Sequence, residues 1–292
     1  MFADFLPPEV AQLTEESSIA LAQQIQRSAI ETPFGSINTA FIQSGSGGTP
    51  ILLLHGFDSS LFEFRRLFPL LSGQHETWIV DLLGFGFSDR PLNTSFTPEA
   101  IKTHLFYFWK ALIGRPVILV GASMGGAAAI DFALTHPEAV AKLVLLDSAG
   151  FAAGPAIGKF LIPPLGFLAT EFLRQPKVRQ QVSLKAYCDP SFVTADAELC
   201  AALHLKLPRW NAALIAFTKS GGYNFLSDKI SQISQPTLIL WGDSDRILGT
   251  KDATRFEGAI AASQLIWIEN CGHVPHLEKP QLTAQHILEF IA

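Results

Sequence analysis

The stretch Val117–Ala129 places a serine between two glycines, where a predicted strand meets a predicted helix. The apolar run Val117–Val120 precedes the turn Gly121–Gly125, which has the pattern Gly-x-Ser-x-Gly, and small residues follow it. A serine on so tight a turn takes a strained backbone conformation, and the two glycines remove side chains that would collide there. We therefore predict that the Ser123 hydroxyl is a nucleophile and that the Met124 amide, at the helix N-terminus, stabilises a developing negative charge.

Two further residues have the types that would activate such a serine. The chain order that suits this chemistry is serine, then acid, then histidine. Asp245 lies on a predicted turn after the apolar run Thr237–Trp241, and His273 lies on the loop after the last predicted strand. We predict that His273 is the general base that takes the serine proton. Asp245 is predicted to orient the imidazole and to stabilise its charged form.

Nearby residues leave alternatives open for both roles. Asp243 stands two positions before Asp245. Asp147 follows the apolar run Leu143–Leu146, a position where some proteins with this motif order carry the acid. His276 competes for the role of base, although its place at the start of the final helix favours a structural role that ties down the loop.

A second motif lies early in the chain. The apolar run Ile51–Leu54 is followed by a His-Gly turn and then by Phe57. In this arrangement the Phe57 amide is predicted to donate to a tetrahedral oxyanion, together with the Met124 amide. The side chain of His55 is expected to be structural and to hold the loop. The combined motifs predict acyl transfer by a nucleophilic serine.

The elements that must position these residues alternate along the chain. Strands are predicted at residues 37–43, 51–54, 77–80, 117–120, 143–146, 238–241 and 264–268, and helices at 99–113, 125–136, 250–262 and 282–291. Such alternation indicates a mainly parallel sheet with helices on both faces. The predicted fold class is α/β, and the motif order resembles that of the α/β-hydrolase fold.

The predicted domain boundaries follow from the same patterns. Residues 1–30 carry apolar positions at helical spacing and are expected to form an amphipathic helix outside the main fold, with a membrane-surface helix as the alternative. The core is predicted over residues 31–149 and 236–292. Residues 150–235 show no convincing buried strand and are rich in Phe, Leu and Ala. They are predicted to form a helical cap inserted after the sixth strand.

The composition of the chain disfavours several classes of binding partner. The chain of 292 residues has a formal net charge of −5 and no block of Lys and Arg, which disfavours nucleic acid as a partner. Three cysteines without a CxxC pair predict neither a disulfide framework nor a metal site, and the chemistry above needs no cofactor. The N-terminus lacks the features of a signal peptide, and no long apolar window predicts a spanning helix. A cytoplasmic location is expected, with peripheral membrane contact left open.

Several longer stretches resemble the chlorophyll dephytylases, hydrolases that cleave the phytyl ester of chlorophyll. The matching stretches are Leu54–Ser60, Leu83–Asp89, Phe106–Lys110, Ala128–Asp131, His136–Val140, Ser220–Asn224, Asn270–His273 and Pro275–Pro280. The likeness runs from about Phe5 to the C-terminus, and its more specific parts are the loop after the first His-Gly turn and the cap stretch. The chain departs from plant members at Ala122, Met124 and Gly126, where they carry Pro, Leu and Ala.

The resemblance implies an apolar ester substrate, chlorophyll, which would be converted to chlorophyllide and phytol at Ser123. It also implies a thylakoid-associated role, and the absence of a transit peptide points to a bacterial member. A phytyl chain needs an apolar groove, for which the candidate cap residues are Phe160, Leu161, Leu165, Phe167, Leu168, Phe172, Leu214 and Phe217. The alternatives are a carboxylesterase for smaller acyl esters, a carbon–carbon bond hydrolase and a non-catalytic ligand receptor.

Overall fold

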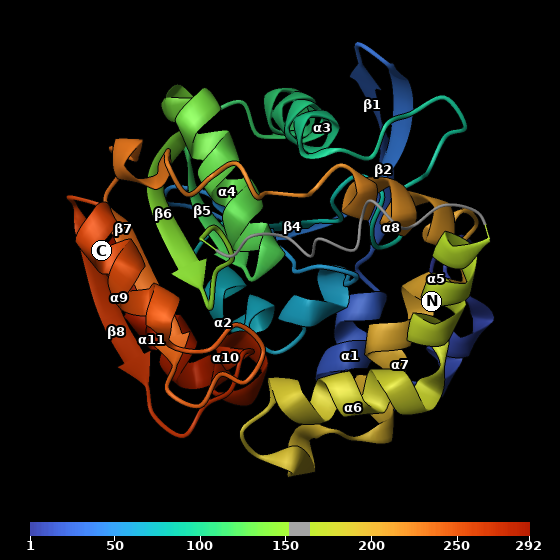
Figure 1. Cartoon of the computed structure of the whole chain (residues 1–292). Coiled ribbons are helices and arrows are strands. Elements are labelled where there is room, and N and C mark those ends of the chain that lie inside the picture. The colour runs from blue at the N-terminus through green and yellow to red at the C-terminus, as the bar shows by residue number, and fades with distance from the viewer. Residues whose placement is uncertain (152–163) are drawn as a thin grey trace.

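The computed structural model describes residues 1–151 and 164–292. Within them the chain forms one sheet of eight strands in the spatial order β1-β2-β4-β3-β5-β6-β7-β8 (Figure 1). The strands are β1 (Gln26–Thr32), β2 (Gly35–Ser44), β3 (Ile51–Leu54), β4 (Thr77–Val80), β5 (Val117–Ala122), β6 (Val140–Leu146), β7 (Thr237–Gly242) and β8 (Ser263–Ile268). The pairs β1–β2 and β2–β4 are antiparallel, and the other neighbouring pairs are parallel. The prediction of an α/β fold with a mainly parallel sheet is confirmed.

Alternate residues of the central strands pack into two hydrophobic cores, one on each face of the sheet. In β3, Leu52 and Leu54 belong to one core, whereas Ile51 and Leu53 belong to the other. All four side chains are fully buried. A strand covered on both faces needs an apolar residue at every position, which explains why these strands are uninterrupted apolar runs in the sequence.

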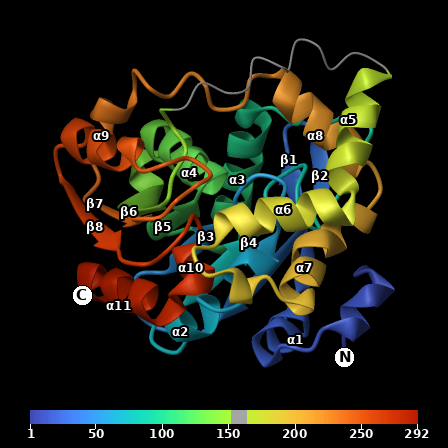
Figure 2. The same cartoon turned by 60° about the horizontal axis from the view of Figure 1, so that its bottom comes forward.

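Helices cover both faces of this sheet (Figure 2). One face packs against α3 (Pro98–Leu112), α4 (Met124–Thr135) and α9 (Lys251–Ala259), and the other packs against α2 (Phe68–Ser72) and α11 (Pro280–Ile291). The N-terminus of α3 has a typical helix cap. The Thr97 side chain accepts a hydrogen bond from the Ala100 amide, and Pro98 occupies the first turn.

The predicted N-terminal helix is wrong in its extent and in its position. Pro8–Gln12 forms a 3-10 turn, α1 covers only Glu16–Ala22, and the residues that follow form strand β1. This strand pairs along its whole length with β2, and the chain turns between the two at Gly35, where φ is +113°. Six apolar residues of the segment are buried in the second core, namely Leu6, Val10, Leu13, Leu21, Ala22 and Ile25. The hydrogen bonds to β2 thus outweigh the helical spacing of the apolar residues in this segment.

The segment between β6 and β7 carries the helical cap, as predicted from the sequence. Its described helices are α5 (Leu165–Arg174), α6 (Pro176–Ala186), α7 (Ala195–Ala202) and α8 (Trp210–Lys219). Helix α6 lies over two loops at the carboxyl ends of strands. Arg179 donates to Asp58 after β3 at 2.6 Å, and the His273 amide after β8 donates to the Ala186 carbonyl at 2.7 Å. No helix within residues 1–151 and 164–292 combines the length and apolar character needed to cross a membrane.

Candidate active site

Ser123 lies on the sharp turn between β5 and α4, with φ of 52° and ψ of −119°. This conformation is strained for a residue with a side chain. The two flanking glycines are required by close backbone approach. A Cβ on Gly121 would collide with the Gly125 carbonyl oxygen, and a Cβ on Gly125 would collide with the Leu54 carbonyl oxygen. The strand, turn and helix that the sequence pattern predicted around Ser123 are therefore present.

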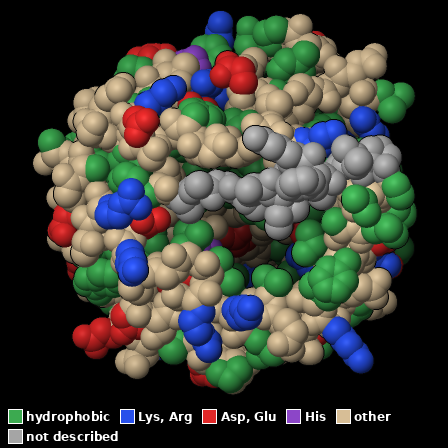
Figure 3. Space-filling view, viewed as in Figure 1, with side chains coloured by type: hydrophobic (Ala, Val, Ile, Leu, Met, Phe, Trp, Pro, Cys, Tyr) green, Lys and Arg blue, Asp and Glu red, His purple; other side chains and the backbone are tan. Residues whose placement is uncertain are grey.

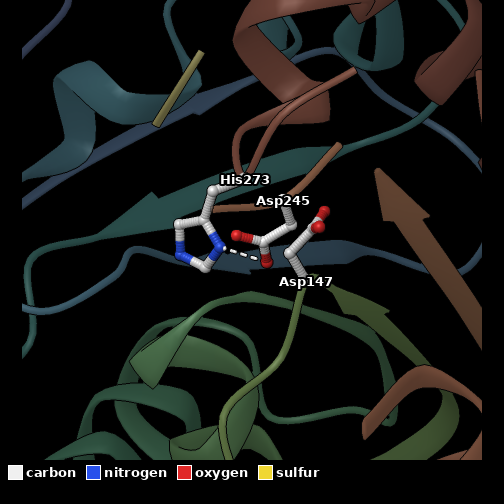
Figure 4. Close-up of side chains that lie close together, drawn as sticks. All are labelled: Asp147, Asp245 and His273. Atoms are coloured by element: carbon white, nitrogen blue, oxygen red, sulfur yellow. Dashed lines mark hydrogen bonds and ion pairs between the residues drawn. The ribbon is translucent and has the colours of Figure 1, made fainter. Parts of the chain in front are cut away.

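The structure brings His273 and Asp245 together. The His273 Nδ1 atom lies 2.9 Å from Oδ2 of Asp245, and the other ring nitrogen points away from the carboxylate (Figure 4). The second carboxylate oxygen of Asp245 accepts hydrogen bonds from the amides of Ile247 and Leu248, at 2.7 and 3.1 Å. These bonds fix the carboxylate, which leaves the His273 ring in one orientation.

Ser123 and His273 line the same cavity. Within the described residues no hydrogen bond of normal geometry joins their side chains. Catalytic hydrogen bonds are often long in the absence of substrate and shorten when it binds, so the arrangement is compatible with proton transfer from Ser123 to His273.

Asp147 lies beside the pair but has a different environment. It is fully buried, and its Oδ1 atom accepts a hydrogen bond from the Gly242 amide at 3.0 Å. Burial and the charge of Asp245 raise the pKa of Asp147 well above its usual range, which disfavours the charged form of this carboxyl group. Donor atoms of Asp147, Asp245 and His273 lie within 4.8 Å of one another. A carboxyl group whose charged form is disfavoured and a carboxylate already bound by backbone amides make a poor ligand set for a cation.

Asp243 and His276, the remaining two alternatives, contact neighbouring loops. Asp243 accepts hydrogen bonds from the amides of Asn270 and Cys271, which fastens the loop that carries His273. The His276 side chain is buried and its Nε2 atom lies 3.2 Å from Oε1 of Glu63. The structure therefore places both residues in supporting positions, and it is Asp245 that contacts His273.

The His-Gly turn after β3 lies against the nucleophile turn. A Cβ on Gly56 would lie 3.3 Å from the Cβ atom of Ser123. The amides of Phe57 and Met124 donate no hydrogen bond to another residue in the described part of the chain, which leaves both available to a ligand. His55 is fully buried. Its Nδ1 atom lies 2.8 Å from the Gly56 carbonyl oxygen, and its Nε2 atom accepts from the Leu82 amide. Burial lowers its pKa to about 4, so His55 holds the loop as a neutral side chain.

The cavity beside Ser123 has a volume of about 280 Å³. Figure 3, viewed as in Figure 1, shows a hollow in the surface with hydrophobic side chains beside it. The cap side of the cavity is formed by α6, through Val182, Ser183 and Ala186, and by α7, through Ala197 and Cys200. The sequence analysis missed these residues because no local pattern distinguishes them from ordinary helix positions.

Within the described residues, the cap residues proposed for an apolar groove do not line this cavity. Phe160 and Leu161 lie outside the described residues. The other six do not line the cavity at Ser123. Four of them, all on α5, expose more than half of their side chains, and the remaining two, on α8, are buried. One of the buried residues, Phe217, packs against Phe57 with ring centroids 5.8 Å apart. The cap thus contacts the site through α8 as well as through α6 and α7.

Comparisons with known proteins agree with this architecture. The model of the alpha/beta hydrolase family matches residues 51–286. The chain is 34% identical to the alpha/beta hydrolase domain-containing protein VTE7 of Arabidopsis thaliana, over all of this chain and 89% of that protein. It is 32% identical to Lipase 1 of Psychrobacter immobilis, over 83% of this chain and 77% of the lipase.

A solved structure of an esterase from Thermogutta terrifontis has a TM-score of 0.78 to this chain at 26% identity, covering 91% of this chain and 98% of the esterase. The overall fold is thus shared with a chain that has diverged widely in sequence. The family match over most of the length, together with the full-length likeness to the Arabidopsis thaliana protein, shows that this chain belongs to the alpha/beta hydrolase family.

Proposed function

We propose that this protein hydrolyses a carboxylic ester through an acyl-enzyme intermediate on Ser123. The observation that carries the proposal is the hydrogen-bonded pair of Asp245 and His273, which opens into the same cavity as the strained Ser123 turn. The free amides of Phe57 and Met124 complete the parts that acyl transfer needs. Two of the similar proteins are a lipase and an esterase, which supports an ester as the substrate.

In the proposed reaction His273 takes the proton of the Ser123 hydroxyl as the oxygen attacks the ester carbonyl. The tetrahedral oxyanion accepts hydrogen bonds from the Phe57 and Met124 amides, and Asp245 stabilises the imidazolium. His273 then gives its proton to the departing alcohol. Water then enters, and His273 takes one of its protons as the water oxygen attacks the acyl-enzyme carbonyl. The bond between the acyl carbon and the Ser123 oxygen breaks, His273 returns its proton to that oxygen, and the acid is released. Loss of one oxyanion donor typically costs on the order of 10²–10³ in rate.

We further propose that the ester is the phytyl ester of chlorophyll. The support is the resemblance to the chlorophyll dephytylases, which extends over the loop after β3 and the cap. Pockets that bury drug-sized ligands commonly have volumes of about 300–1,000 Å³. The cavity of about 280 Å³ would therefore enclose only part of a substrate as large as chlorophyll. The remainder would lie along apolar side chains that α5 exposes, such as Phe167 and Phe172. The same exposed side chains support peripheral contact with the thylakoid membrane.

The test is pigment chromatography with purified protein and detergent-solubilised chlorophyll a, without any added cofactor. Wild type should release chlorophyllide a and phytol, and Ser123→Ala should retain less than about 1% of this turnover because only the nucleophilic oxygen is lost. Ser95→Ala, an exposed serine, is the matched control and should keep full activity. Comparable turnover by Ser123→Ala would show that another group is the nucleophile.

A second candidate substrate is a smaller acyl ester. The observations that favour it are the modest cavity volume and its charged lining, which includes Glu63, Arg65 and Arg179. Under this proposal the protein hydrolyses p-nitrophenyl butyrate well, releases no chlorophyllide, and shows no gain in kcat/KM as the alcohol is lengthened. Under the chlorophyll proposal remote binding of the long alcohol supports the chemical step, so shortening that alcohol lowers kcat/KM.

A further inference from the structure

Three large apolar side chains lie where the cavity at Ser123 opens to solvent. Phe57, Val182 and Ile247 expose 44%, 52% and 40% of their surfaces, and each of them lines the cavity together with Ser123 and His273. They come from the loop after β3, from helix α6 and from the loop after β7. One exposed apolar side chain is ordinary, but three that converge on one cavity from separate segments indicate a binding site for an apolar group.

Hydrogen bonds fasten the loop after β7 to the end of α6. The Arg246 side chain donates to the Tyr187 carbonyl at 2.5 Å and to the Leu184 carbonyl at 3.4 Å. The next residue, Ile247, donates its amide to the Asp245 carboxylate at 2.7 Å. Ile247 is therefore held close both to α6 and to the acid of the proposed triad.

Helix α6 also contacts the loop that carries the proposed general base. The His273 amide donates to the Ala186 carbonyl at 2.7 Å, and a Cβ on Gly272 would lie only 2.2 Å from the same oxygen. Val182 precedes Ala186 by one helical turn, so the two residues lie on the same face of α6, and both line the cavity. Val182 and Ile247 thus belong to two segments that contact the catalytic loops directly.

The position beside His273 determines which part of an ester these side chains contact. In the proposed reaction the imidazole gives its proton to the oxygen of the departing alcohol, so that oxygen must lie within hydrogen-bond distance of the ring. The carbonyl oxygen instead points toward the amides of Phe57 and Met124. The alcohol chain therefore begins next to His273, where α6 and the loop after β7 meet.

We propose that Val182 and Ile247 form an apolar subsite for the alcohol chain of the ester, at the point where that chain leaves the cavity, with the Phe57 ring as a third contact. The inference rests on the proposed ester hydrolysis at Ser123 and names the residues that recognise the alcohol. The phytyl chain matches this subsite, because it is a hydrocarbon and covers the three side chains without burying an unpaired polar group.

The test separates the alcohol chain from the acyl chain with two isomeric esters, hexyl butyrate and ethyl octanoate. Each is compared with ethyl butyrate by pH-stat titration. For wild type, kcat/KM should rise about tenfold from ethyl to hexyl butyrate, because partial burial of the added methylene groups supports the chemical step. Val182→Asn should reduce this rise to about threefold or less. Ile247→Asn should do the same, since its backbone amide still donates to Asp245.

The matched control is Val178→Asn. Val178 lies one turn before Val182 on α6 and does not line the cavity, so this variant should keep the wild-type rise with alcohol length. The rise from ethyl butyrate to ethyl octanoate should be the same in wild type and in all three variants, because the acyl chain lies outside the subsite.

An unchanged rise with alcohol length in folded Val182→Asn and Ile247→Asn would overturn the subsite while ester hydrolysis itself stands. A reduced rise for ethyl octanoate alone would assign the two residues to the acyl chain and would also overturn the proposal. If one of the two variants does not fold, the other decides. If wild type hydrolyses chlorophyll a but no alkyl ester, the ratio of kcat/KM for chlorophyll a to that for methyl chlorophyllide a takes the place of the hexyl-to-ethyl ratio. Hydrolysis of none of these esters refutes the proposed function, and the subsite with it.

Discussion

At the scale of single residues, the two carboxyl groups beside His273 differ in what surrounds them. Asp245 accepts hydrogen bonds from two backbone amides and faces the imidazole. Asp147 is fully buried and accepts a hydrogen bond from one amide, and burial together with the charge of Asp245 raises its pKa well above the usual range. Two ionised carboxylates this close in a buried site repel each other, so the two acids are not equivalent.

This difference predicts unequal effects of two matched substitutions. Asp245→Asn should lower kcat by up to about 10⁴, because the amide cannot hold the His273 tautomer or stabilise the imidazolium. Asp147→Asn keeps the shape of the side chain and an acceptor for the Gly242 amide, and it should change kcat by less than about threefold. Steady-state kinetics with p-nitrophenyl butyrate provides the measurement. The assignment of the acid fails if Asp147→Asn is the crippling change and Asp245→Asn is nearly silent.

At the scale of elements, α3 is joined to the β1–β2 hairpin by a buried polar contact. The His104 Nε2 atom of α3 lies 2.7 Å from Oγ1 of Thr39 on β2, and that hydroxyl donates to the Ile37 carbonyl. Thr39 therefore accepts from the ring, which requires a proton on Nε2. Burial lowers the pKa of His104 to about 4, so the imidazole is neutral in the folded protein.

This contact predicts a pH dependence of stability. In the unfolded chain His104 takes up a proton near its ordinary pKa of about 6.5, whereas in the folded protein it does so only near 4. Unfolding therefore takes up a proton between these values, and stability falls as the pH is lowered from 7 to 5. In urea unfolding, the free energy of unfolding of wild type should fall by on the order of 2 kcal/mol more over this interval than that of the His104→Gln variant.

A suitable control for this experiment is His286→Gln, on the partly exposed face of α11. That variant should retain the wild-type slope of stability with pH. A wild-type slope in His104→Gln would show that His104 is not the group responsible, since other buried titratable groups contribute to the total.

At the scale of the whole molecule, the cap is fastened to the core at the residue after the proposed oxyanion donor. Asp58 has a positive φ of 49°, and its carboxylate accepts from Arg179 on α6 and from Trp210 on α8, while His204 Nε2 lies 3.2 Å away. Burial alone would raise the pKa of Asp58, but the bonds and charges of His204 and Arg179 lower it to about 2. One charged side chain thus connects three cap segments to the loop that carries the Phe57 amide.

Asp58→Asn should therefore affect both stability and turnover. Asparagine tolerates the left-handed backbone conformation at this position. It leaves Arg179 without its carboxylate partner, so the free energy of unfolding should fall by about 3 kcal/mol. Because the Phe57 amide loses its support, kcat for a short ester should fall by about tenfold to a hundredfold. Asp228→Asn, an exposed acid of the cap, should change neither quantity. Loss of stability with unchanged kcat in a folded variant would show that the oxyanion loop holds its position without the cap.

The sequence by itself determined the strand, turn and helix around Ser123, the alternation that builds the parallel sheet, and the two loops that carry Asp245 and His273. These features are encoded locally. A tight turn requires glycine, a strand covered on both faces requires an apolar run, and a loop at the carboxyl end of a parallel strand faces the other such loops. The position of the helical cap followed in the same way from the break in the alternation.

Only the tertiary structure decided which of two nearby acids faces His273, that residues 26–32 pair as a strand, and which cap side chains line the cavity. Each depends on contacts between segments far apart in the chain. The cavity lining combines α6 and α7 with residues after β3, and β1 exists because β2 supplies its hydrogen bonds. Local propensity carries no information about which distant group satisfies a charge, because burial and pairing arise from packing.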